Sequence, residues 1–249
     1  MSTKRVTVVT GGASGIGLGI CTLFAQNGHP VAMLDLDEAA LERESALLRA
    51  RGATILTRKL DVASRDDTIA AYAAVRAGLG PIAVVIANAG ISHSEPFLTT
   101  TPESWQRMID VNLTGMFHTI QQAVPDMIAA GWGRIVTISS QAAQSGASDR
   151  AHYAASKGGV IGLTRSLARE FAAHGITVNT IPPSLVDTPL ARSGMAAFGI
   201  TSLDQMTGHI PIARAGTPED IANACEFLCS DKASYITGQE INVNGGSWM

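Results

Sequence analysis

The sequence predicts an α/β protein built on a doubly wound parallel sheet, and three observations lead to that prediction. Short apolar segments rich in Val and Ile alternate with longer segments of helical periodicity, which is typical of βαβ units. A glycine-rich turn at residues 10–17 directly follows the first apolar segment. The 249 residues are 46% hydrophobic and include no low-complexity stretch, so one domain over residues 1–249 is expected.

Each expected element follows from local signals in chain order. Seven strands are expected near residues 5–10, 30–35, 53–60, 82–88, 134–139, 177–181 and 240–243, with a helical region between each pair. Asp37 is a candidate N-cap for a helix that ends at Gly52. Thr101 and Thr217 each precede a proline at the first helical position, which also indicates a helix start.

The segment 184–216 interrupts this alternation. It contains prolines, scattered glycines and two short apolar patches at 195–198 and 203–206. Because it follows a strand end, where ligands bind in such sheets, a lid over the substrate is expected. A surface excursion without a function is the alternative interpretation.

Composition narrows the class of partner and the location. The net charge of −3 is dispersed and forms no basic stripe, which argues against nucleic acid and favours a small neutral or weakly charged substrate. The first strand starts almost at once and the apolar segments are short, so we expect no leader, no membrane span and a cytoplasmic protein. Cys21, Cys225 and Cys229 have no paired spacing and are expected in the core.

The glycine-rich turn has the context of a dinucleotide-binding loop of the Rossmann type, because it follows a strand and opens a helix. Its glycines would let the backbone approach a pyrophosphate at the positive end of that helix. A turn without a ligand would explain the spacing alone. The residues expected to contact the cofactor here are Gly11, Ser14, Gly15, Ile16 and Gly17.

Asp35 follows at the end of the second strand and makes a ligandless turn a poor explanation. A carboxylate there can accept hydrogen bonds from the ribose 2′- and 3′-hydroxyls and would repel a 2′-phosphate. No Arg or Lys lies in the glycine turn, so NAD is expected in preference to NADP. Asp37 is better explained as a helix cap, and a surface carboxylate is the alternative for Asp35.

The ends of the third and fourth strands add further expected contacts. Asp61 and Val62 are expected near the adenine. Asn88, Ala89 and Gly90 offer small residues and backbone beside the cofactor, although an ordinary strand-ending turn explains them equally well.

Ser140, Tyr153 and Lys157 indicate hydride chemistry on a nicotinamide cofactor. Tyr153 and Lys157 are four residues apart at the expected start of a helix and therefore share one face. A free Tyr has a pKa of about 10, and a nearby Lys⁺ together with an oxidised nicotinamide is expected to lower it. Ser140 would hold the substrate oxygen as charge develops on it.

These motifs resemble the short-chain dehydrogenase/reductase family over the whole chain. The family's TGxxxGxG loop matches residues 10–17, its NAG matches residues 88–90, and its catalytic Ser, Tyr and Lys match the three residues above. The resemblance implies that Asn112 is a fourth catalytic residue, which from the residues alone would be a structural polar residue in a helix. It also implies a sheet ordered 3-2-1-4-5-6-7 and a homotetramer built partly from helices starting near Pro102 and Tyr153.

The resemblance implies further cofactor contacts after the sixth strand. Thr188 matches the position that holds the nicotinamide carboxamide, and Val186 would lie against the ring. Pro183 also belongs to this set, but Ser184 stands where the family commonly has Gly. A backbone conformation with positive φ, which Gly would allow, is therefore not expected at Ser184. The Ser184 hydroxyl would lie near the substrate.

The resulting hypothesis is reversible oxidation of a secondary alcohol to a ketone by NAD⁺. Tyr153 is the general acid/base, Lys157 lowers its pKa and binds the nicotinamide ribose, Ser140 fixes the substrate oxygen, and Asn112 supports proton exit. Three alternatives stay open: an NADH-dependent carbonyl reductase, a dinucleotide-sensing regulator without turnover, and a dehalogenase-like relative without hydride transfer. The regulator is disfavoured because it would have no need for the Ser, Tyr and Lys. The dehalogenase-like relative is disfavoured because the glycine turn and Asp35 would have no ligand.

Candidate substrate contacts are less specific. Besides Ser140 and Tyr153 they are His93, Gln141, Arg150 and Ser184. Arg150 would pair with an anion on the substrate, with a solvated loop Arg as the alternative. His93 and His152 are candidates, although a lone His is more often a packing or surface residue. No HExxH-like spacing occurs, so no catalytic metal is expected.

Overall fold

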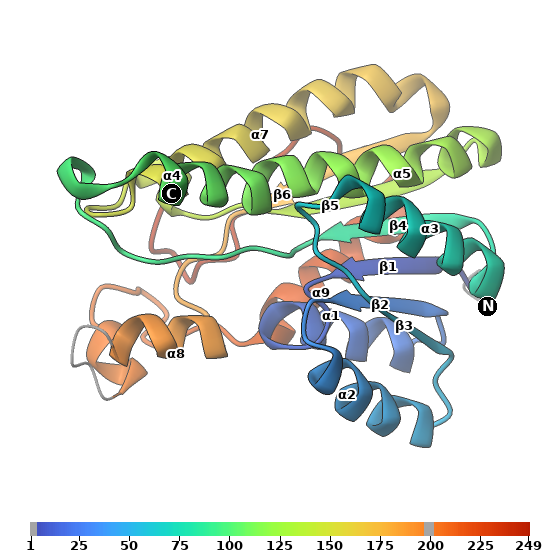
Figure 1. Ribbon diagram of the computed structural model, residues 1–249, viewed down its shortest axis with the longest axis horizontal. Coiled ribbons are helices and arrows are strands. Elements are labelled where there is room, and N and C mark those ends of the chain that lie inside the picture. The colour runs from blue at the N-terminus through green and yellow to red at the C-terminus, as the bar shows by residue number, and fades with distance from the viewer. Residues whose placement is uncertain (1–3, 197–201) are drawn as a thin grey trace.

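The computed structural model describes residues 4–196 and 202–249 and contains a parallel sheet with helices on both faces (Figure 1). Six strands lie in the order β3-β2-β1-β4-β5-β6, the order expected for a Rossmann-type fold. Their bounds are β1 Val6–Thr10, β2 Val31–Asp35, β3 Ile55–Lys59, β4 Ile82–Ala87, β5 Gly133–Ile138 and β6 Ile176–Ile181. The order reverses between β1 and β4, so this is where a ligand cleft is expected.

Strand residues alternate between two hydrophobic cores, one on each side of the sheet. Val85 and Ala87 of β4 belong to the core under α3 (Arg65–Leu79), α5 (Gly115–Ala130) and α7 (Ala151–Phe171). Val84 and Ile86 belong to the core under α1 (Gly15–Gln26), α2 (Glu38–Ala50) and α9 (Pro218–Cys229). Figure 1 shows these two sets of helices on opposite faces of the sheet. This alternation explains why the strands are apolar throughout.

The remaining helical elements lie in the connections. They are η1 (Phe97–Thr99), α4 (Pro102–Ile109), η2 (Asp110–Thr114), α6 (Ala142–Ser145), η3 (Ala172–His174), α8 (Pro189–Ala196), η4 (Leu203–Met206) and η5 (Asp231–Ala233). The turn η2 is a π-helix that joins α4 to α5.

The helix starts predicted from the sequence are confirmed by their caps. The carboxylate of Asp37 accepts a hydrogen bond from the backbone N–H of Ala40, and Thr101 caps α4 through the N–H of Ser104. At α9, Thr217 and Asp220 form a reciprocal capping box.

The seventh strand was the one incorrect part of the sheet prediction. Glu240 forms a single parallel bridge to Thr180 of β6, flanked by hydrogen bonds from Thr180 N to Gln239 O and from Ile241 N to Thr180 O. The segment therefore lies at the expected edge, but it pairs through too few residues to form a strand. Gly245 and Gly246 follow in left-handed conformations and turn the chain away from the sheet.

The three cysteines are buried and free, as predicted. They pack in the core beneath α1 and α9, where burial raises the pKa of each thiol. In the described part of the chain, no helix is both long and apolar enough to cross a membrane.

The described parts of the segment 184–216 contain α8 and η4, and Figure 1 shows α8 beside the sheet. The apolar patch predicted at 203–206 coincides with η4, whereas the patch at 195–198 extends outside the described residues.

Candidate active site

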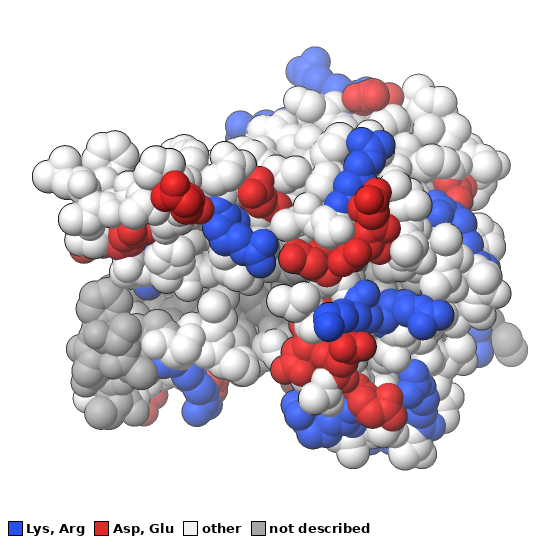
Figure 2. Space-filling model, viewed as in Figure 1, with Lys and Arg blue, Asp and Glu red and all other residues white. Residues whose placement is uncertain are grey.

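A cleft of about 1480 Å³ lies at the carboxyl ends of the strands. Its wall runs from the glycine turn after β1, past the ends of the other strands, to the segment after β6. In Figure 2 this face is hollowed between α8 and the helices above it, and charges of both signs are interspersed over the rest of the face. The cleft lies at the reversal of strand order, where α/β proteins bind their ligands.

Most of the residues predicted for the site line this cleft. They are Gly11, Ser14, Gly15, Ile16, Asp35, Asp61, Val62, Asn88, Ala89, Gly90, His93, Ser140, Gln141, Arg150, Tyr153, Lys157, Pro183, Ser184, Val186 and Thr188. Gly17 and Asn112 do not line the cleft and lie behind residues that do.

The glycine turn fits a dinucleotide because side chains would close it. Gly11 and Gly15 have φ of +65° and +50°, which L side chains rarely adopt. A Cβ at Gly15 would lie 3.2 Å from the side chain of Thr188, on the opposite wall. A Cβ at Gly17 would collide with the carbonyl oxygen of Gly11, so Gly17 lets α1 approach the turn. The bare backbone and the positive end of α1 form the cradle that a pyrophosphate requires.

Ser14 begins α1 with extended backbone, and its hydroxyl makes no capping hydrogen bond in the described structure. Ser14, Gly15 and Ile16 all line the cleft, so the first turn of α1 faces it. The backbone N–H groups of this turn have no helical partner and are available to an anion.

Asp35 lies at the end of β2 with its carboxylate beside the glycine turn. Its Oδ2 accepts a hydrogen bond from the N–H of Ala13 at 3.0 Å, and its Oδ1 accepts one from the N–H of Asp37 at 3.1 Å. These bonds hold the carboxylate in the cleft with capacity left for a ribose hydroxyl. Leu36 lines the cleft next to it, at a position where a basic residue would attract a 2′-phosphate.

The ends of β3 and β4 complete this side of the cleft. Asp61 accepts a hydrogen bond from the N–H of Ala63 at 3.0 Å, and Val62 is buried beside it. The amide of Asn88 donates to the carbonyl oxygens of Thr10 and Gly11 at 3.0 and 3.2 Å. Asn88 therefore ties the end of β4 to the glycine turn, a structural contribution in addition to its place in the wall.

Tyr153 and Lys157 project from the first turns of α7, and Ser140 follows β5. The Nζ of Lys157 lies 6.0 Å from the ring centroid of Tyr153 and donates a hydrogen bond to the carbonyl oxygen of Ile138 at 2.9 Å. Hydrogen bonding between Ser140 and the Tyr153 phenol lowers the pKa of the phenol. The three predicted residues are therefore brought together in one place.

The pKa of Tyr153 is shifted upward by its surroundings in the cleft. Burial raises the pKa above its ordinary value of 10.0, and this effect exceeds the lowering by Ser140 and by the charge of Arg150. Burial also lowers the pKa of Lys157 to about 8. The lowering expected from Lys157 together with an oxidised nicotinamide stays a prediction, and desolvation is the largest effect that the protein itself exerts on either group.

Asn112 lies in the π-helical turn η2 and is fully buried. Its Oδ1 accepts a hydrogen bond from Ile91 N at 2.8 Å, and its Nδ2 donates to Ile91 O at 3.0 Å. A Cβ at Gly90 would lie 3.1 Å from this Oδ1 and 3.3 Å from the Nζ of Lys157. Asn112 therefore holds the connection after β4 against the floor of the site, on the same side as Lys157.

The predicted substrate contacts lie along one end of the cleft. Arg150 donates from its Nε to the Oγ of Ser94 at 3.1 Å and forms no salt bridge within the described residues. The side-chain oxygen of Gln141 is buried, and no described residue donates to it. Positive φ occurs outside glycine only at Asp149 and Ala213 in the described chain, so Ser184 replaces glycine without backbone strain.

The segment after β6 closes the other wall. Val186 is buried and forms a bridge with Gly216, and the Oγ1 of Thr188 accepts a hydrogen bond from the N–H of Ala191 at the start of α8. Both residues lie opposite the glycine turn, as the contact of Thr188 with Gly15 shows.

Sequence reasoning missed two residues that contact the predicted His93 at this end of the cleft. Glu95 and Ser104 join His93 and His152 in one hydrogen-bonded cluster, with the Nε2 atoms of the two imidazoles 3.0 Å apart. The histidines are 59 positions apart in the chain, so no local spacing connects them. Two signals for the cluster were available in the sequence. His152 directly precedes Tyr153, and His93 lies shortly after the end of β4.

Comparison with known proteins agrees with this architecture. A family model described as Enoyl-(Acyl carrier protein) reductase matches residues 11–247. The chain is 37% identical over 254 residues to a 3-oxoacyl-[acyl-carrier-protein] reductase (FabG) of Staphylococcus aureus, covering 100% of both chains. It is 39% identical over 250 residues to an acetoacetyl-CoA reductase of Rhizobium meliloti, covering 99% of each.

Solved structures show the same likeness in three dimensions. Levodione reductase superposes with a TM-score of 0.94 at 30% identity, over 99% of this chain and 98% of that one. A short-chain dehydrogenase/reductase of Brucella melitensis, titled glucose/ribitol dehydrogenase, gives a TM-score of 0.90 at 35% identity over 98% and 97%. Together with the glycine turn and the Ser, Tyr and Lys of the cleft, these matches show that the chain is an oxidoreductase of the short-chain dehydrogenase/reductase family.

Proposed function

We propose that this protein interconverts a secondary alcohol and a ketone with NAD(H), and that ketone reduction is its favoured direction. The observation that carries the proposal is the convergence of Ser140, Tyr153 and Lys157 in a cleft whose opposite wall is a glycine cradle. Residues suited to proton transfer and residues suited to dinucleotide binding therefore share one cavity, which supports the proposal.

The residues of the cleft divide the work of reduction among them. The nicotinamide, when bound, supplies the hydride. Ser140 donates a hydrogen bond to the carbonyl oxygen and stabilises the negative charge that develops there. Tyr153 then gives its hydroxyl proton to that oxygen, and Lys157 offsets the charge left on the phenol. Asn112 holds the connection after β4 so that Gly90 stays against Lys157.

The direction is supported by the ionisation state of Tyr153. Burial raises the pKa of the phenol, which favours its protonated form in the cleft. A proton donor is what ketone reduction requires, whereas alcohol oxidation requires the phenolate. Several relatives are also named for reduction of a ketone group.

NAD(H) is proposed over NADP(H) because of Asp35. Its carboxylate lies in the cleft beside the glycine turn, where it would bind ribose hydroxyls and repel a 2′-phosphate. Leu36 and Ala13 next to it carry no charge that would compensate.

The substrate is proposed to be a ketone that carries a polar or anionic group. Arg150 provides a positive charge without a salt bridge among the described residues, and Gln141 provides a buried oxygen without a described donor. Because relatives are named for 3-oxoacyl and acetoacetyl thioesters, such thioesters belong in the first substrate panel. We also propose that the segment 184–216 acts as a substrate lid, since Val186, Thr188, Met206 and His209 line the cleft.

A homotetramer is proposed as the working assembly. Large apolar side chains remain exposed on η1, α4 and α5, namely Phe97, Leu98, Trp105 and Phe117. Such side chains on neighbouring elements are typical of an interface between subunits. Light scattering coupled to size exclusion would give the mass of four chains, and the mass of one chain would contradict the proposal.

The experiment that tests the proposed function follows NADH absorbance across a panel of ketones and alcohols. We expect consumption of NADH with at least one ketone, slower reduction of NAD⁺ by the matching alcohol at neutral pH, and weaker activity with NADPH. Saturable NADH binding without turnover across a broad panel, thioesters included, would contradict the proposal and support a dinucleotide-sensing regulator.

A further inference from the structure

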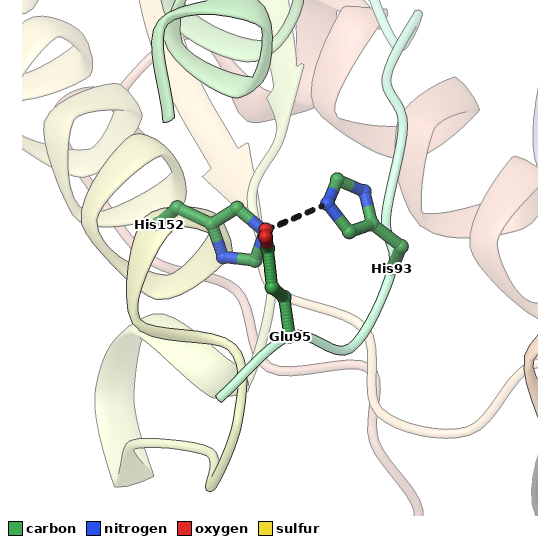
Figure 3. Close-up of side chains that lie close together, drawn as sticks. All are labelled: His93, Glu95 and His152. Atoms are coloured by element: carbon green, nitrogen blue, oxygen red, sulfur yellow. Dashed lines mark hydrogen bonds and ion pairs between the residues drawn. The ribbon is translucent and has the colours of Figure 1, made fainter. Parts of the chain in front are cut away.

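His93, Glu95 and His152 converge on one point beside the substrate end of the cleft (Figure 3). His93 and Glu95 come from the connection between β4 and η1, and His152 comes from the first turn of α7. The Nε2 atoms of the two imidazoles are 3.0 Å apart, and the Oε2 of Glu95 lies 3.5 Å from the first and 3.8 Å from the second. Three candidate metal ligands thus face one another across distant parts of the sequence.

Several atoms that carry lone pairs lie close together in this cluster. The Nε2 of His93 faces the Nε2 of His152 at 3.0 Å, the Oγ of Ser104 at 3.1 Å and the Oε2 of Glu95 at 3.5 Å. The hydroxyl hydrogen of Ser104 is directed to Glu95, at 2.5 Å. With two neutral imidazoles, a ring hydrogen between the two Nε2 atoms leaves the oxygens of Ser104 and Glu95 close to the same nitrogen of His93. A cation at the centre would satisfy all of these electron pairs together.

The distances already match those of a bound transition metal. Zinc bonds of about 2.1 Å to nitrogen and oxygen in a tetrahedron separate the ligand atoms by about 3.4 Å. The observed separations of 3.0, 3.5 and 3.8 Å lie around this value. Two imidazole nitrogens with one carboxylate oxygen favour Zn²⁺, Co²⁺ or Ni²⁺ over Mg²⁺ and Ca²⁺, which prefer oxygen ligands alone.

The neighbouring contacts hold the ligands in place. The N–H of Glu95 donates to the carbonyl oxygen of Asp149 at 2.7 Å, and Arg150 donates to Ser94 at 3.1 Å. These two bonds attach the segment carrying His93 and Glu95 to the residues just before α7, which carries His152. The His152 side chain is 0% exposed, so its ring has little freedom to move. A rigid arrangement of ligands of this kind favours metal binding.

We propose that His93, Glu95 and His152 bind one divalent transition metal ion of the Zn²⁺ type, with the fourth position taken by water or by Ser104. Binding requires each imidazole to carry its ring hydrogen on Nδ1 and requires no oxidant or co-reactant. The metal would join the connection after β4 to the start of α7 at the edge of the substrate region, which His93 also lines. It would not contact the hydride-transfer residues, and the prediction that catalysis needs no metal is separate from this site.

The test uses the full chain without a polyhistidine tag, stripped with a chelator and dialysed. We expect Co²⁺ to bind with a stoichiometry of one per chain, to give the visible absorption of a four-coordinate ion, and to be displaced by Zn²⁺. The variants His93→Ala and Glu95→Gln should each weaken Zn²⁺ binding, measured by titration calorimetry, by at least about 100-fold, since loss of a mere supporting partner already costs 10–100-fold. Zn²⁺ should raise the melting temperature of the wild type and not that of the two cluster variants.

His174→Ala is the matched control, because His174 is an exposed histidine at η3 and lies outside the cluster. It should bind Zn²⁺ as the wild type does. Circular dichroism of each metal-free variant verifies that it is folded, and Glu95→Gln keeps the size of the side chain in case His93→Ala is unstable. Equal Zn²⁺ affinity in the wild type and both cluster variants, or absence of the Co²⁺ absorption in the wild type, would overturn the proposal and leave a hydrogen-bonded pair of histidines.

Discussion

The ammonium group of Lys157 donates a hydrogen bond to the carbonyl oxygen of Ile138, with 2.9 Å between the two atoms. Ile138 is the last residue of β5, and Ser140 lies two positions further along the chain. One strand end therefore positions both Ser140 and Lys157, while α7 adds Tyr153 from the other side. The contact also places the charge of Lys157 in a buried position, which lowers its pKa to about 8.

The lowered pKa of Lys157 should make the stability of the ligand-free protein depend on pH. Between about 8 and the ordinary value of 10.5, the unfolded chain holds a proton that the folded chain has released. The free energy of unfolding should therefore rise by about 3 kcal/mol as pH increases across this range, and this stability is lost again as pH falls. Urea unfolding measured at stepped pH values checks the rise.

Two variants separate this effect from the titration of other groups. Lys157→Met should remove the rise and be more stable than the wild type at neutral pH, because it buries no charge. Lys232→Met, which changes an exposed lysine, should keep the rise. A Lys157→Met protein with the wild-type pH dependence would show that Lys157 is not the group responsible.

Replacing Asp35 by Ser should change cofactor preference. Without the carboxylate, repulsion of a 2′-phosphate disappears and hydrogen bonding to the ribose weakens. We expect the ratio of affinities to move toward NADPH by at least about tenfold, equivalent to about 1.4 kcal/mol, as measured by fluorescence titration with both reduced cofactors.

Asp37→Ala is the matched control, because Asp37 is a neighbouring acid that caps α2. It should lower stability by about 1 kcal/mol and leave cofactor preference unchanged. If both variants moved the preference equally, the effect would come from local negative charge and not from the position of Asp35.

Replacing Gly15 by Ala tests the glycine cradle. Gly15 has a φ of +50°, and a Cβ there would lie 3.2 Å from Thr188 across the cleft. Gly52 also has positive φ, +85°, but a Cβ there would meet nothing within 4 Å. Both alanine variants should lose roughly 1–2 kcal/mol of stability through backbone strain, and only Gly15→Ala should lose NADH affinity, by at least about tenfold. Equal NADH affinity in the two variants would contradict the assignment.

The fold and most of the site could be predicted from the sequence because their signals are local. The glycine turn lies between β1 and α1, Asp35 ends a strand, and Tyr153 and Lys157 share a helix face. These relationships depend only on spacing, and the structure confirms that their residues line one cleft. The caps at Asp37, Thr101 and Thr217 are local in the same way and are confirmed.

What the sequence could not predict depends on packing between distant segments. Desolvation of Tyr153 is set by the walls around the cleft, so its upward effect on the pKa of the phenol could not be predicted from spacing. The edge segment at Glu240 has the composition of a strand but pairs through a single bridge. The clamp of Asn112 on Ile91 needs the π-helical turn η2, which has no sequence signature. The contact of His93 with His152 joins the connection after β4 to the first turn of α7, which are far apart in the sequence.

Arg150→Ala should reduce activity selectively. Arg150 lines the cleft with a charge that no described carboxylate pairs with, so its loss should raise the KM for a ketone bearing a carboxylate by about tenfold. The KM for a neutral ketone of similar size should stay within about twofold, apart from any loss of packing by the arginine stem. Steady-state kinetics on the paired substrates measures both, and equal losses would assign Arg150 a structural role through Ser94.

The central claim is that the phenol of Tyr153 exchanges the proton during hydride transfer. Tyr153→Phe removes that hydroxyl and leaves the ring, Ser140 and Lys157 in place. The decisive measurement is single-turnover oxidation of NADH by the best ketone, with NADH affinity determined on the same sample. We predict that the rate falls by about 10²–10⁴-fold while NADH affinity is retained. A Tyr153→Phe protein that binds NADH and turns it over at the wild-type rate would contradict the account.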